Sequence, residues 1–458
     1  MAFSLIDDAG GAIPLTPLGK AQFARWRDSA APRERDWAAA VGFAGEPGKS
    51  VLVPGEDGRL GHVLVGVAEG EAAMWSVAGL SETLPEGSYR LVAPVEGAGG
   101  GHLALGWALG TYAFTRYKAK PAGKARLVWP ADADRGWVER LAGAVFLARD
   151  LATTPASDMG PEELAAAAQQ VAESQAASCR VVVGDALLAE NYPTIHAVGR
   201  ASTRPPRLVD ITWGDPGAPK VTLVGKGVCF DTGGLDLKTA SGMLQMKKDM
   251  SGAAIALALG QAVMQAGLKL RLRVLLPCVE NAVSGNAMRP LDVIRTRKGL
   301  TVEIGNTDAE GRLILCDALA EAADEKPALL VDFATLTGAA RVALGPELPA
   351  LFCNDDGLAE ALLAAGRAED DPMWRMPLHK GYRRMIDGKV ADLNNVADSP
   401  HAGAVIAALY LDAFVDPAVP WAHLDLLAWN PRARPGRPEG AEPQTLRALY
   451  AYIAARFG

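Results

Sequence analysis

The sequence predicts an α/β protein in which a small N-terminal α/β domain precedes a larger domain with a mainly parallel, helix-covered sheet. Its 458 residues, 49% of them hydrophobic, can bury a large core but exceed the length of one ordinary domain. In the second part of the chain, short apolar runs alternate with helical patterns, as in a parallel sheet with crossover helices. Acidic residues follow some of these runs, at the sheet edge where ligands bind.

The N-terminal part contains apolar runs, HVLVGVA at 62–68 and YRLVAPV at 89–95, between turn clusters and Ala-rich stretches. We therefore predict a small α/β domain over residues 1–145, with a role in oligomerisation or regulation. The larger domain is expected over residues 146–458, and its first helix begins near Pro161.

The strands predicted in the larger domain are short runs rich in Val, Leu and Ile. VTLVGKGV at 221–228, for example, is apolar and ends in glycines, as a buried strand does where it opens into a loop. The predicted strands are 181–184, 207–213, 221–228, 272–279, 328–334, 349–353 and 421–428. The predicted helices are 161–177, 251–268 and 311–324.

The segment from Met250 to Leu268 has no charged residue and nearly the length of a membrane span. It consists mostly of Ala and Gly, and Ser251, Gln261 and Gln265 interrupt it. We interpret it as a buried helix and expect no membrane association.

Composition narrows the class of function. The net charge of −7 argues against electrostatically driven binding of nucleic acid and is ordinary for a cytoplasmic protein. The five cysteines form no CxxC pair, so reduced and buried thiols are expected. The six histidines are scattered and none forms an HExxH pair, so we interpret them as structural.

Carboxylates and lysines are concentrated in two stretches, 225–250 and 305–313, among glycines and apolar residues. An ionised carboxylate in apolar surroundings costs several kcal/mol unless a cation or a donor meets it. Four carboxylates exceed what one ion needs, and oxygen ligands suit Mg²⁺, Mn²⁺ or Zn²⁺, so the sequence predicts two divalent metals and hydrolytic chemistry. The charged residues concerned are Lys226, Asp231, Lys238, Asp249, Asp308, Glu310 and Arg312.

The basic residues of these stretches have several possible roles. A lysine beside two metals can stay charged and stabilise an oxyanion, or lose its proton and become a ligand, and both remain open here. Arg312 falls in the first turn of a predicted helix, where a cation opposes the helix dipole and a bound anion beside it is favoured. For Lys247 and Lys248 we expect a solvated surface role.

These motifs resemble the leucyl aminopeptidase family, also called cytosol aminopeptidases. The family signature NTDAEGRL stands unaltered at 306–313. The motifs GKGVCFDTGGLDLK at 225–238, KKDMSGAA at 247–254, ENAVSGNAMRPLDV at 280–293 and DFATLTGA at 332–339 follow the family's order. The likeness covers roughly residues 145–430 and implies a two-metal aminopeptidase with a macro-like N-terminal domain.

The resemblance implies a metal-binding role for Lys226, Asp231, Asp249, Asp308 and Glu310. Asp231 and Glu310 would bridge the two ions, Lys226 and Asp249 would complete one coordination sphere, and Asp308 would complete the other. The ions would be Zn²⁺, Mn²⁺ or both, and a water bridging them would attack the peptide.

The resemblance implies catalytic roles for Lys238 and Arg312, and a substrate side-chain pocket at Met246, Thr335 and Gly338. Lys238 would polarise the scissile carbonyl, and Arg312 would hold a bicarbonate ion that acts as general base. Because the C-terminal AEPQTLRALYAYI departs from the family pattern, the resemblance does not assign a preference for leucine.

The predicted activity is therefore removal of N-terminal residues from peptides by a cytoplasmic homohexamer. An additional DNA-binding regulatory role is the alternative, because Arg116, Lys118, Lys120, Lys124 and Arg126 form an acid-free cluster, although a solvated loop is the favoured interpretation of that cluster. A metal-binding protein without turnover is disfavoured, because Lys238 and Arg312 are both present.

Overall fold

The structure is a computed structural model that describes residues 3–7, 10–67, 74–92, 99–121 and 123–458. The chain forms two compact units. Unit 1 comprises Met1–Phe146 and Arg432–Glu439, and unit 2 comprises Leu147–Pro431 and Gly440–Gly458. Each unit combines helices with a mainly parallel sheet, which confirms the predicted α/β class.

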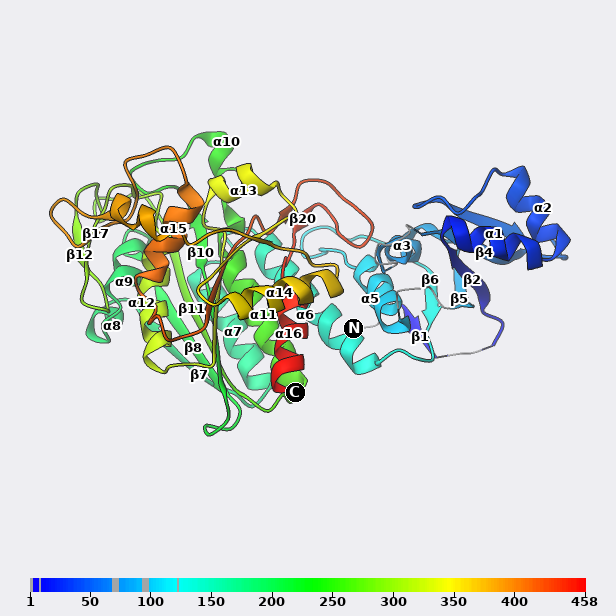
Figure 1. The fold of residues 1–458 in the computed structure, drawn as a ribbon, viewed down its shortest axis with the longest axis horizontal. Coiled ribbons are helices and arrows are strands. Elements are labelled where there is room, and N and C mark those ends of the chain that lie inside the picture. The colour runs from blue at the N-terminus through cyan, green and yellow to red at the C-terminus, as the bar shows by residue number, and fades with distance from the viewer. Residues whose placement is uncertain (1–2, 8–9, 68–73, 93–98, 122) are drawn as a thin grey trace. The chain divides into compact units, whose positions relative to one another are not determined.

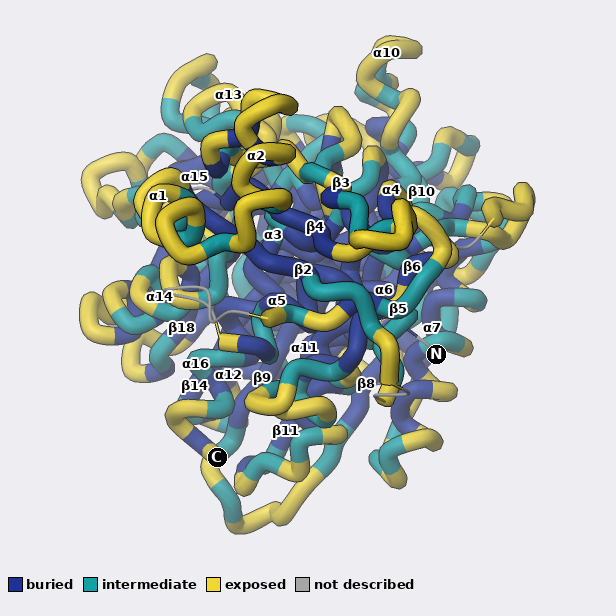
Figure 2. The backbone as a smooth tube through the Cα atoms, turned by 90° about the vertical axis from the view of Figure 1, so that its right-hand side faces the viewer, coloured by how far each residue is buried: buried dark blue, intermediate teal, exposed yellow. Residues whose placement is uncertain are grey.

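Unit 1 contains a sheet that, within the described residues, has six strands in the order β1-β6-β5-β2-β4-β3. Neighbouring strands are parallel except for β3 and β4. In Figure 2, β4 is mostly buried, whereas α1 (Lys20–Ser29) and α2 (Pro32–Ala40) are largely exposed. The strands are β1 (Leu5–Ile6), β2 (Ile13–Leu18), β3 (Ser50–Pro54), β4 (Leu60–Gly66), β5 (Gly87–Leu91) and β6 (Ala125–Val128). The other helices are α3 (Met74–Ala78), α4 (Leu80–Thr83), α5 (Gly100–Gly110) and α6 (Arg135–Thr153), which continues into unit 2.

The two apolar runs predicted in the N-terminal part correspond to β4 and β5. Position 68 of the first run and positions 93–95 of the second lie outside the described residues. The side chains of Leu15, Val63 and Tyr89 from the strands pack with Trp107 of α5 in one buried cluster. Unit 1 therefore has a hydrophobic core of its own.

The basic cluster considered for DNA binding lies before and within β6. Lys120 pairs with Glu82 at 2.7 Å, and Lys124 pairs with Glu86 at 3.2 Å. Two of its cations therefore share their charge with carboxylates, which weakens any attraction to phosphate.

Unit 2 is built on a sheet that has nine strands within the described residues. The path runs β16-β15-β18-β14-β9-β11-β8-β7, and β10 pairs with β11 beside it. The central strands β11, β9, β14 and β18 are parallel. Toward one edge, β8 pairs antiparallel with β11 and β7 pairs antiparallel with β8. Toward the other edge, β15 pairs antiparallel with β18, and β16 pairs parallel with β15. The strands are β7 (Ser178–Val183), β8 (Arg207–Trp213), β9 (Lys220–Gly225), β10 (Gly227–Asp231), β11 (Arg271–Asn281), β14 (Leu329–Ala334), β15 (Ala350–Cys353), β16 (Trp374–Arg375) and β18 (Trp421–Asp425).

Helices cover both faces of this sheet (Figure 1). The helices α7, α11 and α16 lie on one side, and α9, α12 and α15 lie on the other. The predicted helix over 311–324 is confirmed at both ends. The strands predicted in this domain are present with small shifts of their limits, except that the run 221–228 is divided at Lys226 between β9 and β10. The α-helices of unit 2 after α6 are α7 (Pro161–Ser174), α8 (Ala186–Ala189), α9 (Pro193–Gly199), α10 (Ala240–Met243), α11 (Ser251–Gln265), α12 (Gly311–Asp324), α13 (Gly338–Leu344), α14 (Asp356–Ala368), α15 (Gly403–Asp412) and α16 (Leu446–Phe457).

The charge-free segment that follows Met250 forms α11, and nearly all of its side chains are buried between β9, β14 and α16. Across the described part of the chain, no helix combines the length and the apolar character needed to cross a membrane. The apolar character of α11 is therefore explained by its central position in the core.

Two small sheets and two 3₁₀ helices complete unit 2. They form connections that the sequence did not predict. The small strands are β12 (Val293–Arg295), β13 (Thr301–Glu303) and β17 (Leu393–Asn394) in one sheet, and β19 (Trp429–Asn430) and β20 (Gly440–Ala441) in the other. The 3₁₀ helices are η1 (Met246–Met250) and η2 (Lys380–Ile386).

Candidate functional site

The predicted metal ligands come together where strands of unit 2 end. Lys226 lies between β9 and β10, and Asp231 is the last residue of β10. Asp249 lies in η1, directly before α11, and Glu310 is the N-cap residue of α12. The carboxyl ends of parallel strands meet at one sheet edge, so residues far apart in sequence gather there.

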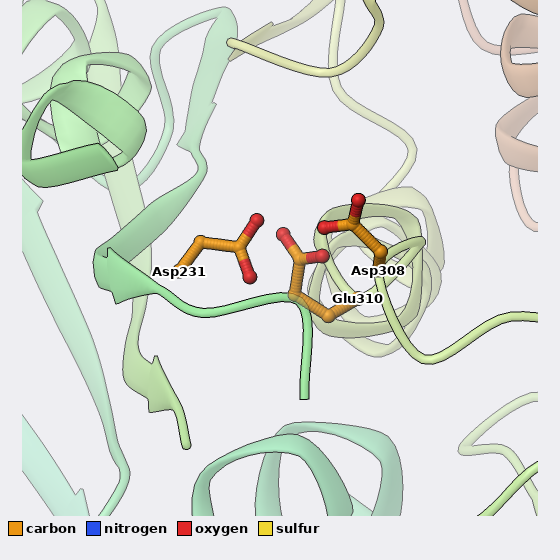
Figure 3. Close-up of side chains that lie close together, drawn as sticks. All are labelled: Asp231, Asp308 and Glu310. Atoms are coloured by element: carbon orange, nitrogen blue, oxygen red, sulfur yellow. The ribbon is translucent and has the colours of Figure 1, made fainter. Parts of the chain in front are cut away.

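The three carboxylates of Asp231, Asp308 and Glu310 point toward one another (Figure 3). One oxygen atom of each lies within 4.8 Å of the others. Asp231 and Glu310 are buried, and Asp308 is partly exposed. Buried carboxylates this close repel one another, which makes the cluster a site for cations.

The pKa values express this repulsion. Burial, followed by the charge of Asp231, raises the pKa of Glu310 to about 8 and that of Asp308 to about 6. The Glu310 Oε2 atom is buried and has no hydrogen-bond donor among the described residues. An unsatisfied carboxylate oxygen in a cluster of carboxylates fits a bound divalent cation, which prefers oxygen ligands.

Two lysines neutralise part of this charge. Lys226 Nζ lies 2.8 Å from Asp249 Oδ2 and 3.0 Å from Glu310 Oε1. Lys238 Nζ lies 2.7 Å from Asp231 Oδ2 and also pairs with Asp308. Burial acts to lower the pKa of each lysine, but the neighbouring carboxylates outweigh it and raise both values.

Backbone and amide groups fix the orientation of the acids. Asp231 Oδ1 accepts hydrogen bonds from Asn281 Nδ2 at 2.9 Å and from the Gly233 N–H at 2.8 Å. Asp249 Oδ1 accepts a hydrogen bond from Thr335 Oγ1 at 2.7 Å. The carboxylates are thus held in place by neighbours that leave their other oxygens facing the cluster.

A glycine at 311 makes room for Lys226. A Cβ atom at this position would lie 2.5 Å from Lys226 Cε and 2.7 Å from its Nζ. Any side chain there would displace the ammonium group from between Asp249 and Glu310. The glycine of the NTDAEGRL motif therefore has a packing role at the site.

The pocket above the cluster has a volume of about 330 Å³ and includes the substrate-binding positions expected from the sequence. Met246, Thr335 and Gly338 all line it, together with Lys238 and the metal-ligand candidates. The structure therefore brings together every predicted site residue except Arg312.

Arg312 lines a neighbouring cavity of about 540 Å³ instead. Its Nη1 donates a hydrogen bond to the Asn395 carbonyl at 2.5 Å, and its buried Nε has no hydrogen-bond partner among the described residues. Burial lowers the pKa of the guanidinium. An unsatisfied buried guanidinium N–H can donate to an anion.

The expected surface role of Lys248 is wrong. The side chain is buried, with 5% of its surface exposed, and it lines the pocket. Lys247 is not freely solvated either, because its Nζ donates to the Thr153 carbonyl and lies over the Trp429 ring. In η1, Lys248 turns its side chain inward beside Asp249, a direction that the sequence pattern did not reveal.

Asn281, Arg341 and Asp425 are further residues of the site that the sequence did not indicate. Asp425 Oδ1 accepts hydrogen bonds from the backbone N–H groups of Leu336 and Thr337, and Oδ2 accepts one from the Thr337 hydroxyl. Arg341 lines the pocket from α13. Asn281 and Asp425 were detectable in principle, since each is a polar residue at the carboxyl end of a central apolar strand.

None of the six histidines lines the pocket. His423 contacts Asp332, His62 contacts Thr16 and Glu34, and the five cysteines are free. The chemistry available at the site therefore rests on carboxylates and lysines.

Family models match most of the chain. The catalytic domain of the cytosol aminopeptidase family matches residues 146–450, and the M17 aminopeptidase N-terminal domain matches residues 13–130. The chain belongs to the cytosol aminopeptidase family. Membership of this family supports aminopeptidase activity, which is a hydrolase activity on peptide substrates.

Curated relatives are named cytosol aminopeptidase or Peptidase B. A probable cytosol aminopeptidase of Leifsonia xyli is 39% identical over 88% of this chain and 86% of its own length. Peptidase B of Pectobacterium atrosepticum is 38% identical over 83% of this chain and 88% of its own length.

Solved structures are also similar to this chain. A cytosol aminopeptidase from Coxiella burnetii has a TM-score of 0.95 and 46% identity, with 100% of both chains covered. The bottromycin maturation enzyme BotP, in a complex with Mn, has a TM-score of 0.89 and 34% identity, with 98% of this chain and 100% of that chain covered. In this chain, the cluster of Asp231, Asp308 and Glu310 could hold a metal ion.

Proposed function

We propose that the protein is a two-metal aminopeptidase that removes N-terminal residues from peptides. The carboxylate cluster carries this proposal, because three acids lie within 4.8 Å of one another and Glu310 Oε2 lacks a donor among the described residues. The ligands would be Lys226, Asp231, Asp249, Asp308 and Glu310. When bound, two Zn²⁺ or Mn²⁺ ions supply Lewis acidity and a water-derived nucleophile.

The chain's own residues orient the peptide and stabilise charge. Lys238 is half-buried beside Asp231 and Asp308, so its ammonium can donate to the carbonyl oxygen on which negative charge develops. Met246, Thr335 and Gly338 would contact the side chain of the N-terminal residue. Leu426 and Leu427 add apolar surface to the same pocket.

Bicarbonate at Arg312 belongs to this proposal as well. Its support is the buried Nε, which is unpaired among the described residues, and the cavity that this side chain lines.

Three further expectations stay predictions. They are assembly as a homohexamer, a cytoplasmic location, and a regulatory or oligomerisation role of the N-terminal domain. Light scattering of the purified protein tests the expected assembly.

The test of the proposed activity uses metal-stripped protein with Zn²⁺, Mn²⁺ or Mg²⁺ added back. We expect metal-dependent release of N-terminal residues from aminoacyl anilides and dipeptides, and a loss of at least about 100-fold in Asp308→Ala and Lys238→Ala. A folded, metal-loaded protein that releases no N-terminal residue from any substrate would leave metal binding without turnover as the better interpretation.

A further inference from the structure

The side chain of Asn281 lies between the two loops that carry proposed metal ligands. Asn281 is the last residue of β11, and only 2% of its surface is exposed. Its Nδ2 donates to Asp231 Oδ1 at 2.9 Å and to the Thr307 carbonyl at 3.1 Å. Because the amide nitrogen carries two hydrogens, these two bonds use both of its donors. One buried amide group therefore joins Asp231 to the residue directly before Asp308.

The bond from Asn281 determines which oxygen of Asp231 remains available. The Gly233 N–H donates to the same Oδ1 atom at 2.8 Å. A carboxylate oxygen has about two lone-pair sites, so these two donors occupy Oδ1. The other oxygen, Oδ2, lies 2.7 Å from Lys238 Nζ at the pocket. Oδ2 is therefore the oxygen that Asp231 offers to a metal ion.

The two loops also have contacts that do not depend on the amide of Asn281. The Asn281 carbonyl accepts from the Thr232 N–H at 3.1 Å and from Thr232 Oγ1 at 2.8 Å. Thr307 joins the loops a second time, because its Oγ1 donates to the Gly233 carbonyl at 2.7 Å and its N–H donates to Asp236 Oδ2 at 2.7 Å. Replacement of the amide alone should therefore leave both loops in place while it frees the carboxylate that the amide holds.

A pair of metal ions depends on the relative placement of Asp231 and Asp308. Two ions that clamp one water lie about 3.5–4 Å apart, so rotation of a carboxylate that bridges them changes both sites. Lys238 also pairs with both acids, but its ammonium is proposed to donate to the substrate carbonyl. The neutral amide of Asn281 has no such second task and can hold both loops throughout the reaction. Hydrogen bonds of this kind orient ligating carboxylates and tune their affinity.

We propose that Asn281 is a positioning residue that sets the spacing of the two metal ions, because one amide group fixes both Asp231 Oδ1 and the Thr307 carbonyl. This inference rests on the proposed two-metal function and adds a residue outside the predicted ligands and catalytic groups. Asn281 acts through the two acids and does not touch the reacting atoms. Its loss should weaken the second ion more than the first, because one ion can draw the freed carboxylate toward itself, whereas a pair needs it in a fixed place.

The test measures Mn²⁺ binding to metal-stripped Asn281→Ser and Asn281→Leu by calorimetry. Serine leaves room for water, and leucine has a similar branched shape but no donor. We expect both variants to keep the first Mn²⁺ and to bind the second at least about tenfold more weakly than the wild type does.

Asn354→Ser and Asn354→Leu are the matched controls. The side chain of Asn354 also joins two backbone groups, since it donates to the Val419 carbonyl at 2.9 Å and accepts from the Trp421 N–H at 2.8 Å, but it lines a different cavity. These variants should lose stability without a change in the affinity for either Mn²⁺ ion. A purely structural role of Asn281 would give the same pattern at position 281.

Electron paramagnetic resonance of the Mn²⁺-loaded proteins gives a second readout that needs no turnover. Two Mn²⁺ ions that share bridging ligands are magnetically coupled, so the wild type should give the signal of a coupled pair and the Asn281 variants that of isolated ions. Wild-type affinity and coupling in both Asn281 variants would overturn the inference and leave the two-metal function intact. Failure of both variants to fold without metal would overturn it too, because the amide would then be a structural group. A wild-type protein that binds no pair of ions would instead contradict the proposed function.

Discussion

Glu310 combines three properties at the scale of a single residue. It is 1% exposed, burial and Asp231 raise its pKa to about 8, and its Oε2 has no donor among the described residues. Lys226 satisfies only the other oxygen, at 3.0 Å. A carboxylate in this position stabilises the fold only when further positive charge reaches it.

Glu310→Gln should therefore separate metal binding from folding. The amide keeps the size of the side chain but removes the charge that attracts a divalent ion. We expect activity to fall by at least about 100-fold and added Mn²⁺ to raise the melting temperature of the wild-type protein but not of the variant. Thermal unfolding with and without Mn²⁺ and metal analysis of the purified proteins measure this.

The control for this variant is Glu360→Gln, a change of the same kind on the exposed side of α14. It should respond to Mn²⁺ as the wild type does. A Glu310→Gln protein that still gains stability from Mn²⁺ would show that Glu310 is not a ligand.

His423 gives the stability of unit 2 a dependence on pH. It is fully buried, its Nδ1 lies 2.6 Å from Asp332 Oδ1, and Trp421 Nε1 donates to the other oxygen of Asp332 at 2.8 Å. Burial acts to lower the pKa of His423, but the charge and hydrogen bond of Asp332 outweigh it and raise the pKa above 6.5. The stabilisation is therefore complete below pH 6.5 and is lost as the pH rises through the folded-state pKa.

The variant His423→Gln keeps a donor for Asp332 but does not titrate. Above pH 6.5, the free energy of unfolding of the wild type should fall relative to that of the variant by up to about 1.4 kcal/mol per pH unit. Chemical denaturation at a series of pH values gives the free energy of unfolding as a function of pH for the wild type and for the variant. Parallel curves between pH 6 and pH 9 would mean that the imidazole does not change its charge in this range.

At the scale of the elements, close packing of α11 against β9 and β14 positions Lys226. A Cβ at Gly252, in the first turn of α11, would lie 2.1 Å from the Phe333 carbonyl oxygen and 2.9 Å from the Lys226 backbone nitrogen. Both neighbours are backbone atoms, so the helix itself would have to move. The position of the metal site thus depends on a helix-to-strand approach that only glycine permits.

Gly252→Ala should lower the free energy of unfolding by about 3 kcal/mol and also reduce activity, because Lys226 moves with the strand end. Gly143→Ala in α6 is the matched control, since nothing lies within 4 Å of its Cβ position. That substitution should gain about 0.5–1 kcal/mol from helix propensity. Chemical denaturation gives the free energy of unfolding of both variants. Equal changes in this free energy for the two variants would contradict the packing argument.

The sequence predicted the elements of unit 2 well where a run of residues is continuously buried. It predicted them less well where contacts with distant parts of the chain determine the limits of a strand. It predicted one strand over 221–228, but the structure divides this run at Lys226. The Lys226 N–H bonds to the Phe333 carbonyl and its carbonyl accepts from the Ala253 N–H, so β10 continues only beside β11. An apolar run cannot reveal such a break, because the partners come from two other elements.

The strands of the β12-β13-β17 sheet were missed for a related reason. They are two or three residues long and partly exposed, and β13 pairs with β17 from a distant part of the chain. For the site, the charged motif residues could be named from the sequence. The burial of Lys248 and the approach of Arg341 to Gly338 arise only in the folded chain. Local patterns report which residues are charged, and tertiary packing decides which of them face the pocket.

At the scale of the whole molecule, each unit has a core of its own. Unit 1 buries Leu15, Val63 and Trp107 in one cluster, and unit 2 buries Val224, Leu275 and Leu330 in another. All of the proposed metal ligands belong to unit 2. A ligand that binds only the folded form of one unit stabilises that unit by mass action.

Removal of metal should therefore act on unit 2 and spare unit 1. Metal present at 100 times its dissociation constant adds about 2.7 kcal/mol, and a chelator withdraws this contribution. Hydrogen exchange should then show faster exchange in the segments 225–250 and 305–313, while β2 and β4 keep their protection because their core contains no metal ligand. Glu310→Gln, already without metal, should exchange alike with and without chelator, whereas an equal loss of protection in both units would mean that the metal stabilises the chain as one cooperative body.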